Sequence, residues 1–141
     1  MEILKRIKDN KRIGWICKLW SQPGSFLSIS LNSSFESRFI VGSVEIKKKE
    51  KTAEIIDFKT KDDDADIFGL ARDYSGIGLG SQIYDFLENH LKSIGIKKIY
   101  ADIYYKDDKD GKASSFWKNR GYTLILVEKD DVKYKIHKEL E

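Results

Sequence analysis

The sequence YSGIGLGS at residues 74–81 decides our interpretation of the fold, because it joins a predicted strand to the clearest helix in the chain. Its three glycines alternate with other residues. They permit positive φ angles and remove Cβ atoms, so backbone N–H groups can converge on a ligand. The following helix adds its own unpaired N–H groups and the positive end of its dipole. We interpret the stretch as an anion site suited to phosphate.

The glycine pattern does not fit the common nucleotide motifs. A P-loop ends in Gly-Lys followed by Ser or Thr, and no lysine follows Gly80. A dinucleotide fingerprint reads GxGxxG, whereas the pattern here is GxGxG. A plain glycine-rich turn is the alternative interpretation.

The predicted helix begins near Ser81 and is amphipathic. Glu88 and Lys92 have the i,i+4 spacing of a favourable pair, and Gly95 stands where a C-terminal glycine cap belongs. We expect His90 to pack in the core rather than act as a base. The apolar stripe consists of Ile83, Phe86, Leu87, His90, Leu91 and Ile94.

The remaining elements follow from alternation and turn signals. The charged segment 47–51 predicts a hairpin turn, and 61–64 reads as an acidic connection. We expect strands at 26–31, 39–46, 53–60, 66–71, 96–105, 122–127 and about 134–140, and a short helix at 113–120 ended by Gly121.

This order predicts one domain, residues 1–141, of the α/β (α+β) class. The sheet is mixed and mostly antiparallel, with a central right-handed strand–helix–strand crossover and a C-terminal hairpin. Residues 1–37 are the divergent part, because no helical stripe precedes Phe39.

The composition limits the function. Lysines and arginines number 26 against 23 acidic residues, a net charge of +3, which argues against nucleic-acid binding. The single cysteine, Cys17, and two histidines exclude a disulfide framework and predict no metal site. No apolar run approaches the roughly 20 residues of a membrane span. Residues 1–20 lack the continuous apolar stretch of a signal peptide, so we expect a cytoplasmic protein with no membrane partner.

Two motifs resemble those of the GNAT superfamily of acyl-CoA N-acyltransferases. The segment DYSGIGLGS at 73–81 is similar to motif A, Glu-Tyr-Arg/Gln-Gly-x-Gly-x-Gly/Ala-Ser. The segment ASSFWKNRGY at 113–122 is similar to motif B, Ala-x-x-Phe-Tyr-x-Lys-x-Gly-Phe. The resemblance runs from Phe39 to the C-terminus, with both motifs in the expected order.

The resemblance implies acetyl-CoA as co-substrate. The preceding strand would pair with the pantetheine arm through Leu70 and Ala71, and Phe116 would line the thioester end. A strand N–H would stabilise the oxyanion. The pyrophosphate would lie on the backbone amides of Ser75, Gly76, Ile77, Gly78, Leu79, Gly80 and Ser81.

The chain departs from the family at three points. Ser75 replaces the motif A arginine or glutamine, and Trp117 replaces the motif B tyrosine that often protonates the leaving thiolate. An indole N–H only donates hydrogen bonds, so Tyr105, with Tyr104 or water as alternatives, is our candidate acid. The two helices that follow the family's first strand have no counterpart in the pattern of 1–37.

The chemistry also needs a neutral acceptor amine. An alkyl ammonium has a pKa of about 10.4, so neutralising it at pH 7 costs about 4.6 kcal/mol. A carboxylate usually assists, and alternation favours Asp66, with a solvated carboxylate as the alternative. The other candidates are Asp64, Glu45, Glu54 and Asp57, and the acidic runs at 62–66 and 107–110 could attract a cationic amine.

We therefore expect an N-acetyltransferase in which a primary amine attacks acetyl-CoA directly in a ternary complex. A non-catalytic GNAT-fold module that binds CoA or a protein is the alternative. The acceptor is a small-molecule or protein amine. Trp15 and Trp20 are expected in the core, with an aromatic acceptor pocket or a homodimer contact as alternatives.

Overall fold

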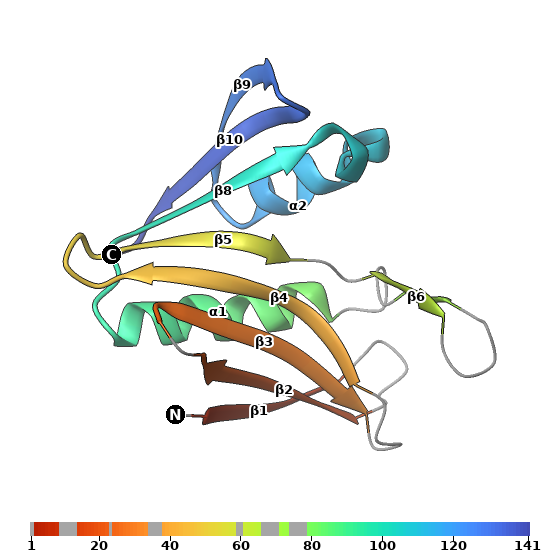
Figure 1. Ribbon diagram of the computed structural model, residues 1–141, viewed down its shortest axis with the longest axis vertical. Coiled ribbons are helices and arrows are strands. Elements are labelled where there is room, and N and C mark those ends of the chain that lie inside the picture. Colours follow the sequence, from red (N-terminus) through yellow and green to blue (C-terminus); the bar gives the residue numbers. More distant parts are fainter. Residues whose placement is uncertain are drawn as a thin grey trace.

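The computed structural model describes residues 2–8, 14–22, 24–33, 38–58, 61–65, 71–73 and 79–141. Within these ranges a large sheet is covered by two α-helices (Figure 1). In chain order the elements are β1 (Glu2–Lys8), β2 (Gly14–Ser21), β3 (Phe26–Ser33), β4 (Arg38–Lys47), β5 (Thr52–Phe58), β6 (Lys61–Ala65), β7 (Ala71–Asp73), α1 (Gly80–Ser93), β8 (Lys98–Tyr104), α2 (Lys112–Asn119), β9 (Thr123–Lys129) and β10 (Val132–Glu139), with two 3-10 turns between β8 and α2.

The main sheet is mixed and mostly antiparallel, which confirms the predicted fold class. Its strand order is β1-β2-β3-β4-β5-β8-β10-β9. Every neighbouring pair is antiparallel except β5 and β8, which run parallel. Because α1 lies between β5 and β8 in the chain, these three elements form the predicted strand–helix–strand crossover.

The strand that enters the crossover was predicted wrongly. It is β5, not a strand at 66–71, because β5 already occupies the edge of β8 through the pairs from Thr52↔Lys98 to Ile55↔Ala101. The segment predicted as an acidic connection forms β6. It pairs with β7 in a separate two-stranded sheet, and residues 66–70 lie outside the described ranges.

The core lies between the helices and one face of the sheet. Strand residues that point toward the helices, such as Leu19, Ile29, Val44 and Ala101, are buried. The predicted stripe of α1 is confirmed, His90 included, with two differences: Tyr84 is also buried, and Ile94 at the helix end is 37% exposed. In Figure 1 α1 lies behind the sheet, next to β3 and β4.

Glycines end both helices as predicted. Gly95 has a φ of 89° and Gly121 a φ of 91°, in the left-handed region that glycine tolerates best. After Gly95 the chain folds back, and the N–H of Ile96 donates to the carbonyl of Leu91 at 3.0 Å. The predicted C-terminal hairpin is confirmed as β9 and β10, and at its turn Asp130 and Asp131 both have positive φ, as a tight hairpin turn requires.

The described residues of the divergent amino-terminal region lie mostly in strands. The predicted strand at 26–31 is confirmed as β3, and β1 and β2 extend the sheet beyond it. Trp15 and Cys17 lie in the core; burial raises the pKa of the Cys17 thiol to about 12, with nearby Lys5 opposing the effect. Trp20 is half-buried, with the Lys18 ammonium 5.7 Å from its ring centre.

Neither helix in the described ranges is long and apolar enough to span a membrane.

Candidate functional site

The two parallel strands separate to form a fork. β5 and β8 are paired only as far as Ile55↔Ala101. Beyond that point β5 stays with β4, and β8 continues beside β10, where Asp102 faces Lys135. Figure 1 shows the two strands diverging toward the end of β5, close to where α1 begins.

A bulge in β5 shapes one arm of the fork. Val44 of β4 pairs with Ile55 and Ser43 pairs with Asp57, so Ile56 has no partner in β4. Such an extra residue breaks the alternation and leaves backbone groups unpaired. Ile56 is 48% exposed. Opposite the bulge, Gly42 approaches so closely that an added Cβ would lie 1.8 Å from the carbonyl oxygen of Asp57.

Two hollows meet at the fork and share Glu54 and Asp102. The smaller, of about 70 Å³, is also lined by Ile55, Ile56 and Tyr104. The larger is a groove of about 290 Å³ that runs over β5, β8 and β10 on the face of the sheet turned away from α1. The two carboxylates therefore stand where the bulged backbone and the groove come together.

The amino end of α1 is compatible with an anionic ligand. No side chain caps it within the described ranges, and its first turn carries no acidic side chain. Leu79 is fully buried, and its carbonyl accepts the N–H of Ile83 at 2.9 Å. The side-chain amide of Gln82 instead holds the backbone of Lys8, with its Nε2 donating to the Lys8 carbonyl at 2.5 Å. This contact fixes the end of β1 beside the start of α1.

Half of the predicted cofactor residues lie outside the described ranges. Of those that are described, Leu79, Gly80 and Ser81 form the start of α1, and Ala71 lies in β7, apart from the main sheet. The predicted base Asp66 is also outside. The residues of the site that the structure does not describe are Asp66, Leu70, Ser75, Gly76, Ile77 and Gly78.

An aromatic cluster fixes α2 against α1 and the end of β5. Phe116 stacks on Phe58 with ring centres 5.9 Å apart, and Trp117 meets Tyr84 at 5.7 Å and Tyr122 at 5.0 Å. Trp117 is only 8% exposed. The tyrosine position of motif B is therefore occupied here by a residue that packs in the core. Neither Phe116 nor Trp117 lines the hollows at the fork.

The two candidate tyrosines have different surroundings. Tyr104 lines the smaller hollow. Tyr105 lies beyond it, with the Lys133 ammonium 6.0 Å from its ring centre. Loss of solvent contact and the hydrogen-bonded Glu128 carboxylate raise the pKa of Tyr105, while Lys133 opposes the rise.

Asp108, from one of the acidic runs, has a structural role that sequence analysis missed. Its carboxylate accepts the backbone N–H of Ser114 at 2.8 Å and the Ser114 hydroxyl at 2.6 Å, and it pairs with Lys133 at 2.9 Å. Burial alone raises the pKa of Asp108, but these hydrogen bonds and the lysine charge outweigh it and hold the pKa below its ordinary value. Asp108 thus caps α2.

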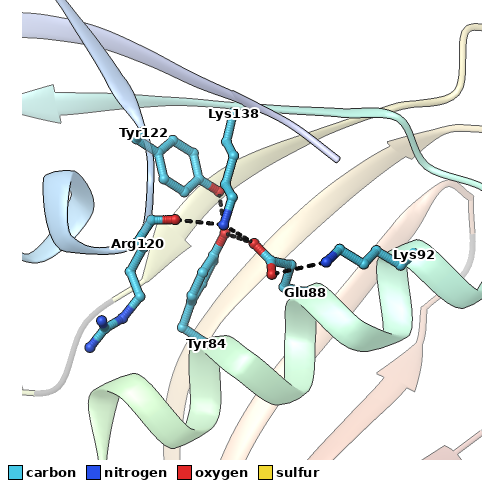
Figure 2. A network of polar contacts seen from close by, with 6 residues as sticks. All are labelled: Tyr84, Glu88, Lys92, Arg120, Tyr122 and Lys138. Atoms are coloured by element: carbon cyan, nitrogen blue, oxygen red, sulfur yellow. Dashed lines mark hydrogen bonds and ion pairs between the residues drawn. The ribbon is translucent and has the colours of Figure 1, made fainter. Parts of the chain in front are cut away.

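A second polar network lies under the helices, where it joins α1 to β10 and to the segment that follows α2 (Figure 2). The Lys138 ammonium contacts Glu88 at 2.5 Å and donates to the carbonyl of Arg120 at 2.6 Å. Tyr84 donates to Glu88 at 2.9 Å, and its oxygen lies 2.9 Å from that of Tyr122. Because a carboxylate only accepts, the proton of Tyr84 points to Glu88, and Tyr122 donates to Tyr84.

This network holds Glu88 in its charged form. Burial alone raises the pKa of Glu88, but the hydrogen bonds from Lys138 and Tyr84 and the charges of Lys138 and Lys92 hold it below its ordinary value. The predicted pair of Glu88 with Lys92 is confirmed at 3.5 Å.

The comparisons with known proteins point to one fold. No family model matches the chain, and no curated protein matches its sequence. Among solved structures, the GNAT domain of PAT from S. lividans superimposes with a TM-score of 0.69 and 10% identity, and the match covers 97% of each chain. The chain has the GNAT fold.

Two further GNAT structures agree with this assignment. A GNAT-family acetyltransferase from Staphylococcus aureus Mu50 gives a TM-score of 0.58 at 16% identity, over 84% of this chain and 70% of the other. PaiA N-acetyltransferase from Thermoplasma acidophilum, in complex with coenzyme A, gives 0.53 at 16% identity, over 82% and 60%. Identities this low establish the GNAT fold alone.

Proposed function

We propose that the protein is an acyl-CoA-dependent N-acyltransferase that moves an acetyl group from acetyl-CoA to a primary amine in a ternary complex. The observation that carries the proposal is the fork, where the carboxylates of Glu54 and Asp102 line two adjoining hollows beside a bulged strand. The GNAT fold supports it, and PaiA, one protein with this fold, binds coenzyme A.

The binding of acetyl-CoA is assigned to the segment from Ser75 to Ser81 and the start of α1. A helix terminus with no side-chain cap and no acidic first turn suits a pyrophosphate. When bound, acetyl-CoA supplies the thioester that the amine attacks. The unpaired backbone at Ile56 is our candidate donor to the thioester oxygen, in place of a strand at Leu70 and Ala71.

The carboxylates at the fork serve the acceptor. Glu54 and Asp102 attract an ammonium group, and one of them, directly or through a water molecule, takes its proton before attack. Asp66 stays a second candidate for this step. Tyr104 lines the small hollow together with both carboxylates, whereas Tyr105 does not line it. Tyr104 is therefore the better placed of the two predicted proton donors to the departing thiolate.

The burial of Trp117 favours the second candidate function, a GNAT-fold module that binds CoA or a protein without turnover. Its indole is enclosed by aromatic rings and cannot supply a proton at the fork. Such a module would bind acetyl-CoA but release no free thiol.

A paired experiment tests both candidates. Thermal unfolding with acetyl-CoA should show a rise in Tm, because a ligand that binds only the folded state stabilises it. Release of free thiol across a broad amine panel should then exceed the amine-free rate. Gly78→Asp should abolish binding by placing a charged side chain in the proposed pyrophosphate site. Binding without thiol release selects the module, and no binding at millimolar acetyl-CoA refutes both.

A further inference from the structure

The groove on the open face of the sheet carries a defined pattern of charge. Strand register places its side chains in rows on one face: Lys47 opposite Thr52, Glu54 opposite Tyr100, and Asp102 opposite Lys135. All of them line the same groove of about 290 Å³. No helix of the described ranges covers this face, and Tyr100 is accordingly 41% exposed.

The opposite charges occupy different places in the groove. Glu54 and Asp102 are at the fork, because both also line the small hollow. Lys47 lies at the other end, since its partner Thr52 is two residues before Glu54 on β5, about 7 Å along the strand. Lys135 lies opposite Asp102 on β10. The carboxylates of Glu54 and Asp102 are therefore at the fork end of the groove, with Lys135 beside Asp102, and Lys47 is the groove lysine farthest from the fork.

These charges are available to a ligand. The side chains of Glu54, Asp102 and Lys47 make no hydrogen bond or ion pair with another described residue. The Lys138–Glu88 pair on the other face, by contrast, is fully engaged. Exposed charged side chains that form no ion pair within the fold can interact with a ligand of complementary charge.

We infer that this groove binds the acceptor, and that the acceptor is a zwitterion: a small molecule with a primary amine at one end and a carboxylate at the other. The inference rests on the proposed function. The ammonium lies between Glu54 and Asp102, the alkyl chain crosses Tyr100, and the carboxylate meets Lys47. Polyamines are disfavoured, because their second cation would face Lys47.

Three acceptors of matched chain length test the inference. Thiol release from acetyl-CoA is measured with 6-aminohexanoate, hexylamine and 1,6-diaminohexane. We expect kcat/KM to be highest for 6-aminohexanoate and lowest for the diamine, with each step about tenfold, the size expected of one charge-assisted contact. A preference for the diamine, or equal rates for all three, would overturn the inference.

A lysine variant locates the carboxylate. Lys47→Gln should lower kcat/KM for 6-aminohexanoate about tenfold and leave that for hexylamine unchanged. Lys48→Gln is the matched control, because Lys48 lies in the adjoining turn and does not line the groove. Loss of the hexylamine reaction in Lys47→Gln, or an equal effect of Lys48→Gln, would contradict the assignment.

A binding measurement separates failure of the inference from failure of the enzyme. Amide signals of Tyr100 and Asp102 are followed by NMR while 6-aminohexanoate is added, with no acetyl-CoA present. Shifts in the wild type that weaken in Lys47→Gln support the groove even if no probe is acetylated. Turnover of simple amines without these shifts would uphold the proposed function and refute the zwitterion site.

Discussion

The polar side chains under the helices and those on the open face of the sheet are of the same types but are used differently. Under the helices, Glu88 and Lys138 form an ion pair whose side chains are 13% and 23% exposed, and further hydrogen bonds complete it. On the open face the side chains of Glu54 and Asp102 form no hydrogen bond or ion pair with a described residue. The comparison suggests that the first set stabilises the fold and the second recognises a ligand.

The largest expected effect comes from breaking the enclosed pair. Lys138→Met should lower the free energy of unfolding by about 2–3 kcal/mol, because it leaves Glu88 mostly buried without its nearest cation. Denaturant unfolding measures the change. Adding Glu88→Leu should restore at least half of the loss, since an apolar pair can replace a buried ion pair. If the free energy of unfolding of Lys138→Met alone were within about 0.5 kcal/mol of the wild-type value, the Glu88–Lys138 pair would not stabilise the fold.

Asp108 offers the next largest effect. Asp108→Ala removes the cap of α2 and the partner of Lys133, so we expect a loss of about 1–2 kcal/mol in chemical denaturation. Ser115→Ala, on the exposed side of α2, is the control and should change stability little. Equal stability of the two variants would show that the cap contributes nothing.

The same carboxylate predicts a pH dependence. The pKa of Asp108 is lower in the folded state than the ordinary value of about 3.9. Its stabilising contribution is therefore complete above that value and is lost as the pH falls through the folded pKa. Unfolding curves from pH 7 to pH 2 should converge for wild type and Asp108→Asn at the acid end. A constant difference between the two would contradict the folded pKa shift.

The smallest effect on stability is expected on the open face. Glu54→Gln and Asp102→Asn should change the free energy of unfolding by less than about 0.5 kcal/mol, as surface substitutions usually do. If the proposed function holds, at least one should lower kcat about 100-fold, the size of a lost general base. Strong destabilisation with no change in kcat would reverse the roles of the two sets.

The carboxy-terminal part of the fold could be predicted because each element carries its own signal. The stripe of α1 ends at Gly95, and α2 ends at Gly121, so both helices are visible locally. The strands β1 and β2 are hidden because apolar side chains such as Ile16 and Trp20 occupy the open face, while Lys5 lies on the row that faces the helices. Alternation therefore fails in both strands.

The site was less predictable, because it depends on pairing between distant segments. A strand at 66–71 was favoured because it directly precedes the glycine loop in sequence. In the structure the parallel neighbour of β8 is β5. The bulge at Ile56 breaks the period of two in β5 and cannot be seen without β4. Glu54 was one candidate among several until the fork placed it beside Asp102.

The most direct test of the account is amide chemical-shift mapping with coenzyme A added to the isotopically labelled protein. We predict that the largest shifts cluster at the start of α1, in Gly80 to Gln82, and at the bulge of β5, in Ile56 and Asp57. Unchanged signals in both places at millimolar coenzyme A, or shifts confined to the outer strands β1 and β9, would contradict it.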